Sequence, residues 1–264
     1  MQDIRDIIFK DILDKKFKAF ITPERYGCLS GVEDAYKQAK VIGIELELFY
    51  KEGDSIEKGK PIGTVIATPK MMAVAEEKII GTLAKFSGIA TAARKAVELA
   101  EGKVRITAGS WKKMPPVMKD GVRTAVVSGG ATFRITDNNM IYLDKNYIKM
   151  LGSIPKVLET VKDIKDSMKV VQIKGCDISI EEETRQALEN GCGLLMVDTG
   201  NIDDLNRCLA VVNELGVRKQ VEIAFASGVK FENIKELACI DIDVLCIGKE
   251  IVDAQLLDMK LDVI

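Results

Sequence analysis

The stretch GLLMVD (193–198), followed by NIDDLNRCLAVVNELG (201–216) and VEIAFASG (221–228), decides the fold of this chain. The first and third segments are short and almost wholly apolar, and the segment between them has the spacing of an amphipathic helix. Strands of a parallel sheet read as continuous apolar runs, because helices cover the sheet and bury both faces of each strand. The stretch therefore predicts two parallel strands joined by a helix.

The same alternation extends from Val104 toward the C-terminus. Further apolar runs occur at VRITAG (104–109), MIYL (140–143), KVVQIKG (169–175) and DVLCIG (243–248). Helix patterns lie at residues 153–168 and 179–191, and Ser179 with Glu182 has the spacing of a capping box at the start of the second. Six such strands predict a TIM-like α/β barrel smaller than the full TIM barrel, with its active loops at the carboxyl ends of the strands.

Residues 1–103 have a different pattern, so we expect them to form a separate N-terminal domain and residues 104–264 to form the barrel. An opening helix precedes a β-rich stretch that starts at residues 39–48 and ends in EGDSIEKGKPIGTVIA (52–67), where Gly53-Asp54 and Gly59-Lys60 mark turns between short strands. A long helix pattern follows over residues 71–99, where small residues such as Gly88 favour close helix packing over a ligand contact. The C-terminal tail belongs to the barrel or returns to the N-terminal domain.

The composition excludes several classes of protein. Of 264 residues, 47% are hydrophobic and 30% are charged, which is typical of a globular protein. The formal net charge of -2 gives no bulk attraction to nucleic acid, and no segment reads as a signal peptide or a membrane span. We therefore expect a cytoplasmic protein that acts on small molecules and binds neither nucleic acid nor membranes.

Cysteine and histidine usage narrows the chemistry. The six cysteines stand singly, and there is no histidine to complete a zinc site, so we expect reduced and mostly structural thiols. The absence of histidine also excludes serine triads. General acid and base roles are left to Asp, Glu, Lys or Tyr side chains.

Polar residues and glycines follow the predicted strands, where the loops of a parallel barrel converge. They include Ser110, Trp111, Lys112, Arg134, Asp144, Lys145, Asn146, Lys174, Asp198, Ser227, Gly228, Gly248 and Lys249. Cations, glycines that admit close backbone N–H groups, and a carboxylate together suit a phosphate with a magnesium ion. Alternatively, each glycine pair is an ordinary turn and each lysine is a solvated surface residue.

Two of these residues have competing interpretations. Asp198 ends an apolar strand, so its carboxylate either faces a polar barrel mouth or caps the following helix, and we favour the functional role. Trp111, the only tryptophan, is either an apolar plug over the barrel mouth or a stacking platform for a heterocycle. The sequence leaves both interpretations of Trp111 open.

Seven segments together resemble a known family. They are EGDSIEKGKPI (52–62), AEEKIIGTLAKFSGIAT (75–91), KKMPPVMKDGVRTAVVSGGATFR (112–134), DKNYI (144–148), LLMVDTGN (194–201), ASGVKFENI (226–234) and DVLCIGKEI (243–251). Their order and spacing resemble the quinolinate phosphoribosyltransferase family, also known as nicotinate-nucleotide pyrophosphorylase. The resemblance implies an N-terminal α/β sandwich beside a six-stranded open barrel, in a homodimer. It also implies transfer of a phosphoribosyl group from phosphoribosyl pyrophosphate to quinolinate, with Mg²⁺ as cofactor and release of carbon dioxide.

The resemblance also implies roles for individual residues. Lys112 and Asp198 are implied to be catalytic, and Asp198 to hold the metal or the ribose. Ser227, Gly228 and Gly248 are implied to bind the 5′-phosphate. The positions expected to bind substrate, from the resemblance and the strand ends, are Trp111, Arg134, Asp144, Lys145, Asn146, Gln172 and Lys174.

Several positions depart from the family pattern. Trp111 replaces a substrate-binding arginine, and Glu77 replaces an arginine lent by the partner subunit. Histidines are replaced by Phe133 and Tyr147, and acidic residues by Gln172 and Phe225. At Asp144 and Lys145 the acid and the lysine stand in the reverse order. Each charge-assisted hydrogen bond contributes about 1.5–3 kcal/mol, so losing arginines weakens a site for two adjacent carboxylates. We therefore expect a diverged phosphoribosyltransferase whose acceptor is a less acidic nitrogen heterocycle.

Two other functions remain open from the sequence. One is a non-catalytic protein that binds a ribose phosphate or nucleotide on the same fold, consistent with the replaced residues. The other is Schiff-base chemistry on Lys112, Lys145 or Lys174.

Overall fold

The computed structural model describes residues 3–264 and divides the chain into two compact units. The first unit contains the chain up to Lys95 together with Trp111–Ala131 and Ile251–Ile264, and the second contains Ala96–Ser110 and Thr132–Glu250. This division differs from the expected boundary between residues 103 and 104. A compact unit is defined by packing in space, and here the chain passes between the units more than once.

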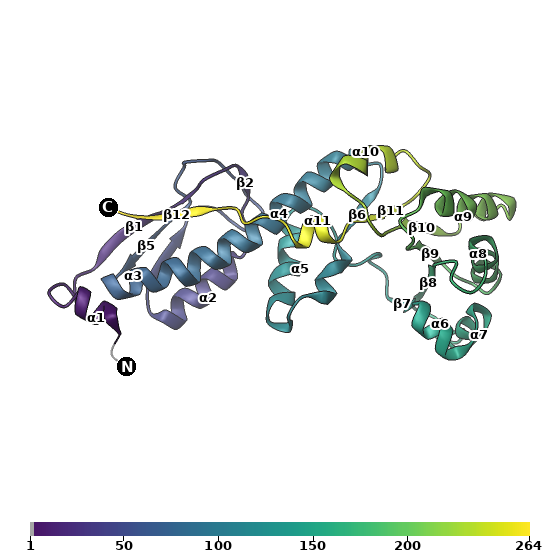
Figure 1. The fold of residues 1–264 in the computed structure, drawn as a ribbon, viewed down its shortest axis with the longest axis horizontal. Coiled ribbons are helices and arrows are strands. Elements are labelled where there is room, and N and C mark those ends of the chain that lie inside the picture. Colours follow the sequence, from purple (N-terminus) through teal and green to yellow (C-terminus); the bar gives the residue numbers. More distant parts are fainter. Residues whose placement is uncertain (1–2) are drawn as a thin grey trace. The chain divides into compact units, whose positions relative to one another are not determined.

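The first unit is built on a four-stranded antiparallel sheet in the order β12-β1-β5-β3. Its strands are β1 (Phe17–Pro23), β3 (Glu45–Leu48), β5 (Gly63–Ala67) and β12 (Met259–Val263). A separate ribbon pairs β2 (Gly27–Cys28) with β4 (Ser55–Ile56). Strand β12 comes from the C-terminal tail and lies beside β1 (Figure 1), so the tail is part of the N-terminal sheet.

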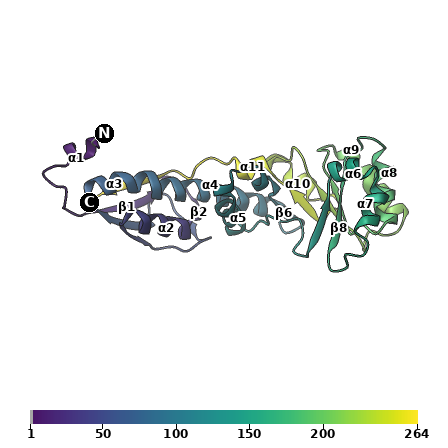
Figure 2. The same ribbon diagram turned by 90° about the horizontal axis from the view of Figure 1, so that it is seen from below.

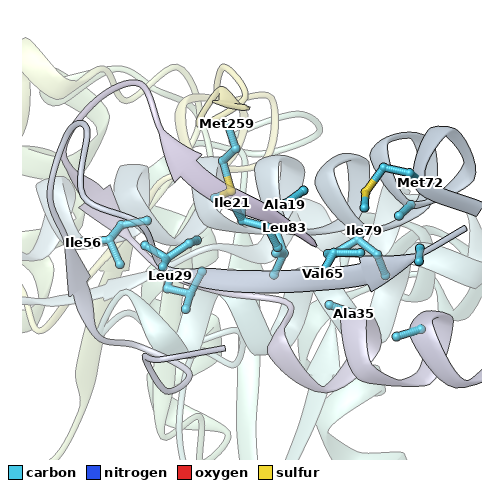
Figure 3. Close-up of a cluster of buried hydrophobic side chains, with 14 of the residues drawn as sticks. Ala19, Ile21, Leu29, Ala35, Ile56, Val65, Met72, Ile79, Leu83 and Met259 are labelled. Carbon is cyan, nitrogen blue, oxygen red and sulfur yellow. The ribbon is translucent and has the colours of Figure 1, made fainter. Parts of the chain in front are cut away.

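Helices pack on this sheet around an apolar core. The helical segments that lie wholly or partly in the first unit are α1 (Ile4–Ile8), α2 (Val32–Ile42), α3 (Pro69–Ala75), the π-helical turn η1 (Glu76–Ile80), α4 (Gly81–Ala100), the 3-10 turns η2 (Gly109–Lys113) and η3 (Pro116–Met118), α5 (Lys119–Ser128) and α11 (Lys249–Val252). Helix α2 contacts β3, and α3 contacts β5. Figure 3 shows the resulting core, in which Ile21, Val65, Ile79 and Leu83 are fully buried.

The expected β-rich stretch from residue 39 to residue 67 is wrong at its start, because α2 continues to Ile42, whereas β3, β4 and β5 lie in the rest of it. Ala35 and Ala39 are buried one helical turn apart, so Ala39 belongs to the buried face of a helix, whereas Val41 of the same helix is 80% exposed. Gly43 adopts φ +71° and ends the helix, and strand β3 begins only at Glu45.

The long helix predicted over residues 71–99 is confirmed, as α3, η1 and α4 follow one another without interruption. Of its small residues, Gly88 serves close packing, since a Cβ there would lie 2.2 Å from the carbonyl oxygen of Gln255, whereas a Cβ on Gly81 would meet open space. No helix within residues 3–264 combines the length and apolarity needed to cross a membrane.

The second unit is a six-stranded parallel sheet in the order β6-β11-β10-β9-β8-β7, the predicted open barrel. Its strands are β6 (Arg105–Thr107), β7 (Met140–Leu143), β8 (Met168–Ile173), β9 (Leu194–Val197), β10 (Glu222–Phe225) and β11 (Val244–Cys246). The connecting helical segments are α6 (Lys145–Leu151), α7 (Ile154–Thr160), α8 (Ile180–Glu189), α9 (Ile202–Glu214), η4 (Phe231–Asn233) and α10 (Ile234–Leu237). Figure 2 shows α6 to α9 grouped on one side of β8.

Alternation along the strands separates the barrel interior from the helix layer. Val170, Leu194, Met196, Ala224 and Val244 form one buried cluster. Because successive strand residues point to opposite faces, the interior rows continue through positions two residues further on. This places the next polar side chains of β8 and β9 at the carboxyl end of the barrel interior.

Burial of the cysteines predicts their reactivity. Burial raises the pKa of Cys28 to about 11, of Cys192 to about 12 and of Cys208 to about 11, from an ordinary 9.0. Cys176 and Cys239 are exposed. We expect Ellman's reagent at pH 8 to modify Cys176 and Cys239 first, and the three buried thiols only after unfolding.

The same pKa shifts predict a loss of stability at alkaline pH. Below pH 9.0 the buried thiols are protonated in both states, and their stabilising effect is complete. Above pH 9.0 the thiols ionise first in the unfolded state. The free energy of unfolding therefore falls until the thiols of the folded state ionise near pH 11 to 12. Fast labelling of Cys28 in the native protein, detected by peptide mapping, would show that this thiol is accessible and would contradict its raised pKa.

Candidate functional site

The sheet order sets which residues are neighbours along the carboxyl edge of the barrel. From β11 to β7 this edge carries Gly248, Ser227 with Gly228, Asp198, Lys174 and Asp144. Asp198 therefore lies between a glycine-containing half, after β10 and β11, and a charged half, after β7 and β8.

Asp198 is held by polar contacts from the neighbouring strand. The Gln172 Nε2 group donates to Asp198 Oδ2 at 2.6 Å, and the Lys174 Nζ atom lies 3.8 Å from the same oxygen. The Lys174 ammonium also donates to the main-chain carbonyl of Asp198. Gln172 is buried, and its Oε1 atom accepts a hydrogen bond of 2.8 Å from the backbone N–H of Lys145. One polar network thus joins the ends of β7, β8 and β9.

The capping interpretation of Asp198 is wrong, because another residue caps the next helix. The Asn201 side chain accepts from the Asp203 N–H at 2.9 Å at the start of α9. The Asp198 side chain remains 28% exposed. Its carboxylate is accordingly oriented by Gln172 and Lys174 and still reachable from solvent, which suits a group that binds a ligand.

Asp144 has a local role that sequence reasoning missed. Its Oδ1 atom accepts from the backbone N–H groups of Asn146 at 2.8 Å and Tyr147 at 3.1 Å, so Asp144 is the N-cap of α6. An aspartate directly before a helix is a common cap, which was the available signal. The side chains of Lys145 and Asn146 are exposed on the first turn. Substrate binding by these three residues stays a prediction.

Tyr142 is a second residue that the sequence did not single out. It is partly buried and packs against the buried cluster of the barrel interior, one strand position before β7 ends. Burial raises its pKa above the ordinary value, and the negative charge of Asp198 acts in the same direction. The phenol is therefore neutral at physiological pH.

Arg134 lies on a segment anchored to the end of β6. Thr132 pairs with Thr107 in a parallel bridge, and their Oγ1 atoms are 2.7 Å apart. The Thr132 hydroxyl also donates to the carbonyl oxygen of Arg134 at 2.8 Å. The guanidinium of Arg134 is exposed and donates to the Asn138 carbonyl at 3.4 Å. Its backbone is therefore fixed at the barrel while its side chain faces solvent.

Trp111 and Lys112 belong to the first unit. The guanidinium of Arg123 lies 4.8 Å from the centroid of the Trp111 ring, in cation–π geometry, and Arg123 is also paired with Asp120. One face of the indole is thus covered by a cation, and a ligand that stacked on this face would have to displace Arg123. Lys112 is exposed on the turn η2.

The loops after β9 and β10 fit closely against each other. Ser227 adopts φ +83° and Gly228 φ +68°, a left-handed turn that includes one non-glycine residue. The Gly200 N–H donates to the Ala226 carbonyl at 3.1 Å, and a Cβ on Gly200 would lie 2.7 Å from the Ser227 carbonyl oxygen. The turn implied to bind phosphate is therefore braced by Gly200. A Cβ on Gly248 would similarly lie 2.2 Å from Ser110 Oγ.

Replacing Gly200 with alanine should distort this turn. Gly200 has φ +72°, and Gly216 has φ +67° but open space around it, so Gly216→Ala measures the backbone strain alone. We expect Gly216→Ala to cost about 1 kcal/mol in the free energy of unfolding. Gly200→Ala should cost roughly 1–3 kcal/mol more, because it adds a steric clash. Equal losses in urea unfolding would show that Gly200 does not brace the turn.

Comparisons with known proteins agree with this architecture. Models described as "Quinolinate phosphoribosyl transferase, N-terminal domain" and "C-terminal domain" match residues 6–87 and 89–262. A relative from Methanothermobacter thermautotrophicus, named "Probable nicotinate-nucleotide pyrophosphorylase [carboxylating]", is 24% identical over 98% of this chain and 93% of its own length. The human "Nicotinate-nucleotide pyrophosphorylase [carboxylating]" is 24% identical over 83% of this chain and 73% of its own.

Solved structures show the same fold. The nicotinate-nucleotide pyrophosphorylase from Francisella tularensis superposes with a TM-score of 0.83 at 19% identity, covering 98% of this chain and 90% of that protein. The one from Pyrococcus furiosus gives a TM-score of 0.77 at 22% identity, covering 100% and 74%. With both domain models matched in order, the chain belongs to the quinolinate phosphoribosyltransferase family.

Proposed function

We propose that this chain is a phosphoribosyltransferase of the quinolinate/nicotinate type, which transfers the phosphoribosyl group of phosphoribosyl pyrophosphate to a nitrogen heterocycle. The observation that carries the proposal is the Asp198 carboxylate, oriented by Gln172 and Lys174 in the middle of the carboxyl edge. Relatives matched over most of the chain are named as pyrophosphorylases, which favours catalysis over a protein that only binds ribose phosphates.

The order of residues along the edge suggests how the substrate lies. The 5′-phosphate would accept hydrogen bonds at the Ser227–Gly228 turn and at Gly248, which follow the neighbouring strands β10 and β11. The ribose would then lie over Asp198, whose negative charge stabilises the positive charge that develops at C1′. The ring nitrogen forms a bond to C1′ while the C1′–oxygen bond breaks, and pyrophosphate leaves with the electron pair. Lys174 would offset part of the charge on that leaving group.

Magnesium is compatible with this arrangement. Within residues 3–264 no group of three or more His, Cys, Asp or Glu residues is placed to hold a metal ion. Mg²⁺, however, is commonly bound through one or two carboxylates together with substrate phosphates and water. Asp198 would supply the protein ligand, and the metal would neutralise charge on the pyrophosphate.

We propose an acceptor less acidic than quinolinate. Trp111 replaces a family arginine and already carries a cation on one face, and Lys174 is engaged by Asp198. Losing that arginine weakens the binding of two adjacent ring carboxylates. We also propose that the protein is a homodimer, as the family resemblance implies. A cytoplasmic location is proposed because the six cysteines, all within residues 3–264, are free thiols.

Phosphorus NMR tests the function directly. The protein would be incubated with phosphoribosyl pyrophosphate, MgCl₂ and, in separate samples, quinolinate, nicotinate, neutral pyridines and azoles. We expect pyrophosphate release and a new ribonucleotide signal with at least one acceptor less acidic than quinolinate. No release with any acceptor counts against catalysis, and faster release with quinolinate than with the others counts against the proposed acceptor.

A further inference from the structure

Glu183 is a buried carboxylate outside the residues described so far. It lies on α8, is only 8% exposed, and its Oε2 atom accepts two backbone hydrogen bonds from the loop after β8. The donors are the N–H groups of Lys174, at 2.6 Å, and Gly175, at 2.9 Å. A carboxylate is rarely buried without such partners, because removing its charge from water is costly.

These hydrogen bonds are not part of the cap of α8. The cap is Ser179, whose Oγ atom accepts from the Glu182 N–H at 3.2 Å, as the sequence predicts. Glu183 instead reaches back over the loop to the residue that follows β8. Gly175 adopts φ +64°, so the chain turns sharply at the point where Glu183 holds it.

The segment that Glu183 holds carries Lys174, the cation that is paired with Asp198. Gln172 and Lys174 are two residues apart, so their side chains point to the same side of the strand and both reach Asp198. Gln172 is fixed further by the Lys145 N–H, whereas Lys174 lies beyond the last paired residue of β8. The backbone of Lys174 therefore depends on Glu183 for its position.

We propose that Glu183 is a positioning residue that holds Lys174 against Asp198 for phosphoribosyl transfer. The proposal rests on the function proposed above. The Glu183 carboxylate accepts from the N–H groups of Lys174 and Gly175, so it acts on Asp198 through the backbone that carries the Lys174 side chain. Its removal leaves two N–H donors without their acceptor, and the Lys174 ammonium then samples positions away from Asp198.

A double-mutant cycle tests this coupling. We expect Glu183→Ala and Lys174→Met each to lower kcat/KM by about 10- to 100-fold, and the double variant to be no worse than Lys174→Met. Glu183→Gln keeps an acceptor oxygen and should fall between the wild type and Glu183→Ala. The control is Glu182→Gln, which removes an exposed charge from the same helical turn and should leave activity unchanged. A further loss in the double variant equal to the loss from Glu183→Ala alone would overturn the proposal.

A second measurement does not depend on activity. Amide hydrogen exchange at Lys174 and Gly175 should become faster in Glu183→Ala, and acetic anhydride should label the Lys174 amine faster, with Lys145 as the internal reference. Unchanged exchange and labelling in a folded Glu183→Ala protein would overturn the positioning role. If the wild type transfers no phosphoribosyl group, the proposed function fails, while these two rates still report whether Glu183 holds Lys174.

Discussion

Replacing Asp198 with asparagine is expected to lower kcat/KM for phosphoribosyl transfer by about 100- to 1000-fold. The substitution removes the negative charge that would stabilise the developing positive charge at C1′. It also removes the carboxylate that would hold magnesium. The asparagine oxygen can still accept from Gln172 Nε2, which now donates to Asp198 Oδ2 at 2.6 Å. The protein should therefore keep its fold, and the loss should come from chemistry rather than from unfolding.

Asp203→Asn provides the matched control. Asp203 is an exposed residue on the first turn of α9, so its substitution removes the same charge close to the site without touching Asp198. We expect its kcat/KM to be within twofold or so of the wild type, in keeping with the weak effect of exposed charges. A kcat/KM for Asp198→Asn equal to that of Asp203→Asn would remove Asp198 from the mechanism.

Replacing Phe225 with alanine should have the largest effect on stability, about 3–5 kcal/mol in the free energy of unfolding. Phe225 is 2% exposed and stands between Ala224 and Ala226 of the interior cluster. Alternation places its ring in the layer between the sheet and the helices, where a truncated side chain leaves a cavity. Urea unfolding measures the loss.

Phe49→Ala is the control, since Phe49 is 50% exposed and should lose less than about 1 kcal/mol. The resemblance to the family implies that Phe225 replaces an acidic residue, so a catalytic interpretation of the position is also testable. If Phe225 lined the substrate site, its replacement would raise KM strongly with little loss of stability. That result would contradict the outward orientation.

The barrel could be predicted from the sequence because its strands carry a strong local signal. The runs at residues 169–175 and 193–198 are mainly apolar up to their carboxyl ends, and a covered parallel sheet buries both faces of such strands. The error at residues 39–43 arose where the local signal is ambiguous. Ala39 and its neighbours fit a strand and a helix face equally, and Gly43 ends either element.

The candidate site could be predicted only as a set of strand ends. Asp198 stands out because a carboxylate directly follows an apolar strand, and the sheet order then gives its neighbours. The contacts of Gln172 with Asp198 and of Glu183 with the Lys174 N–H depend on side-chain conformations and on packing between separate elements. Nothing in the local sequence specifies such contacts. The cation over Trp111 likewise comes from Arg123 on a different helix.

A crystal structure of the protein grown with phosphoribosyl pyrophosphate and MgCl₂ tests the central claim most directly. We expect the 5′-phosphate at the Ser227–Gly228 turn and Gly248, with the ribose and the metal next to Asp198. A ligand bound elsewhere on the protein, with the carboxyl edge around Asp198 left to solvent, would contradict it.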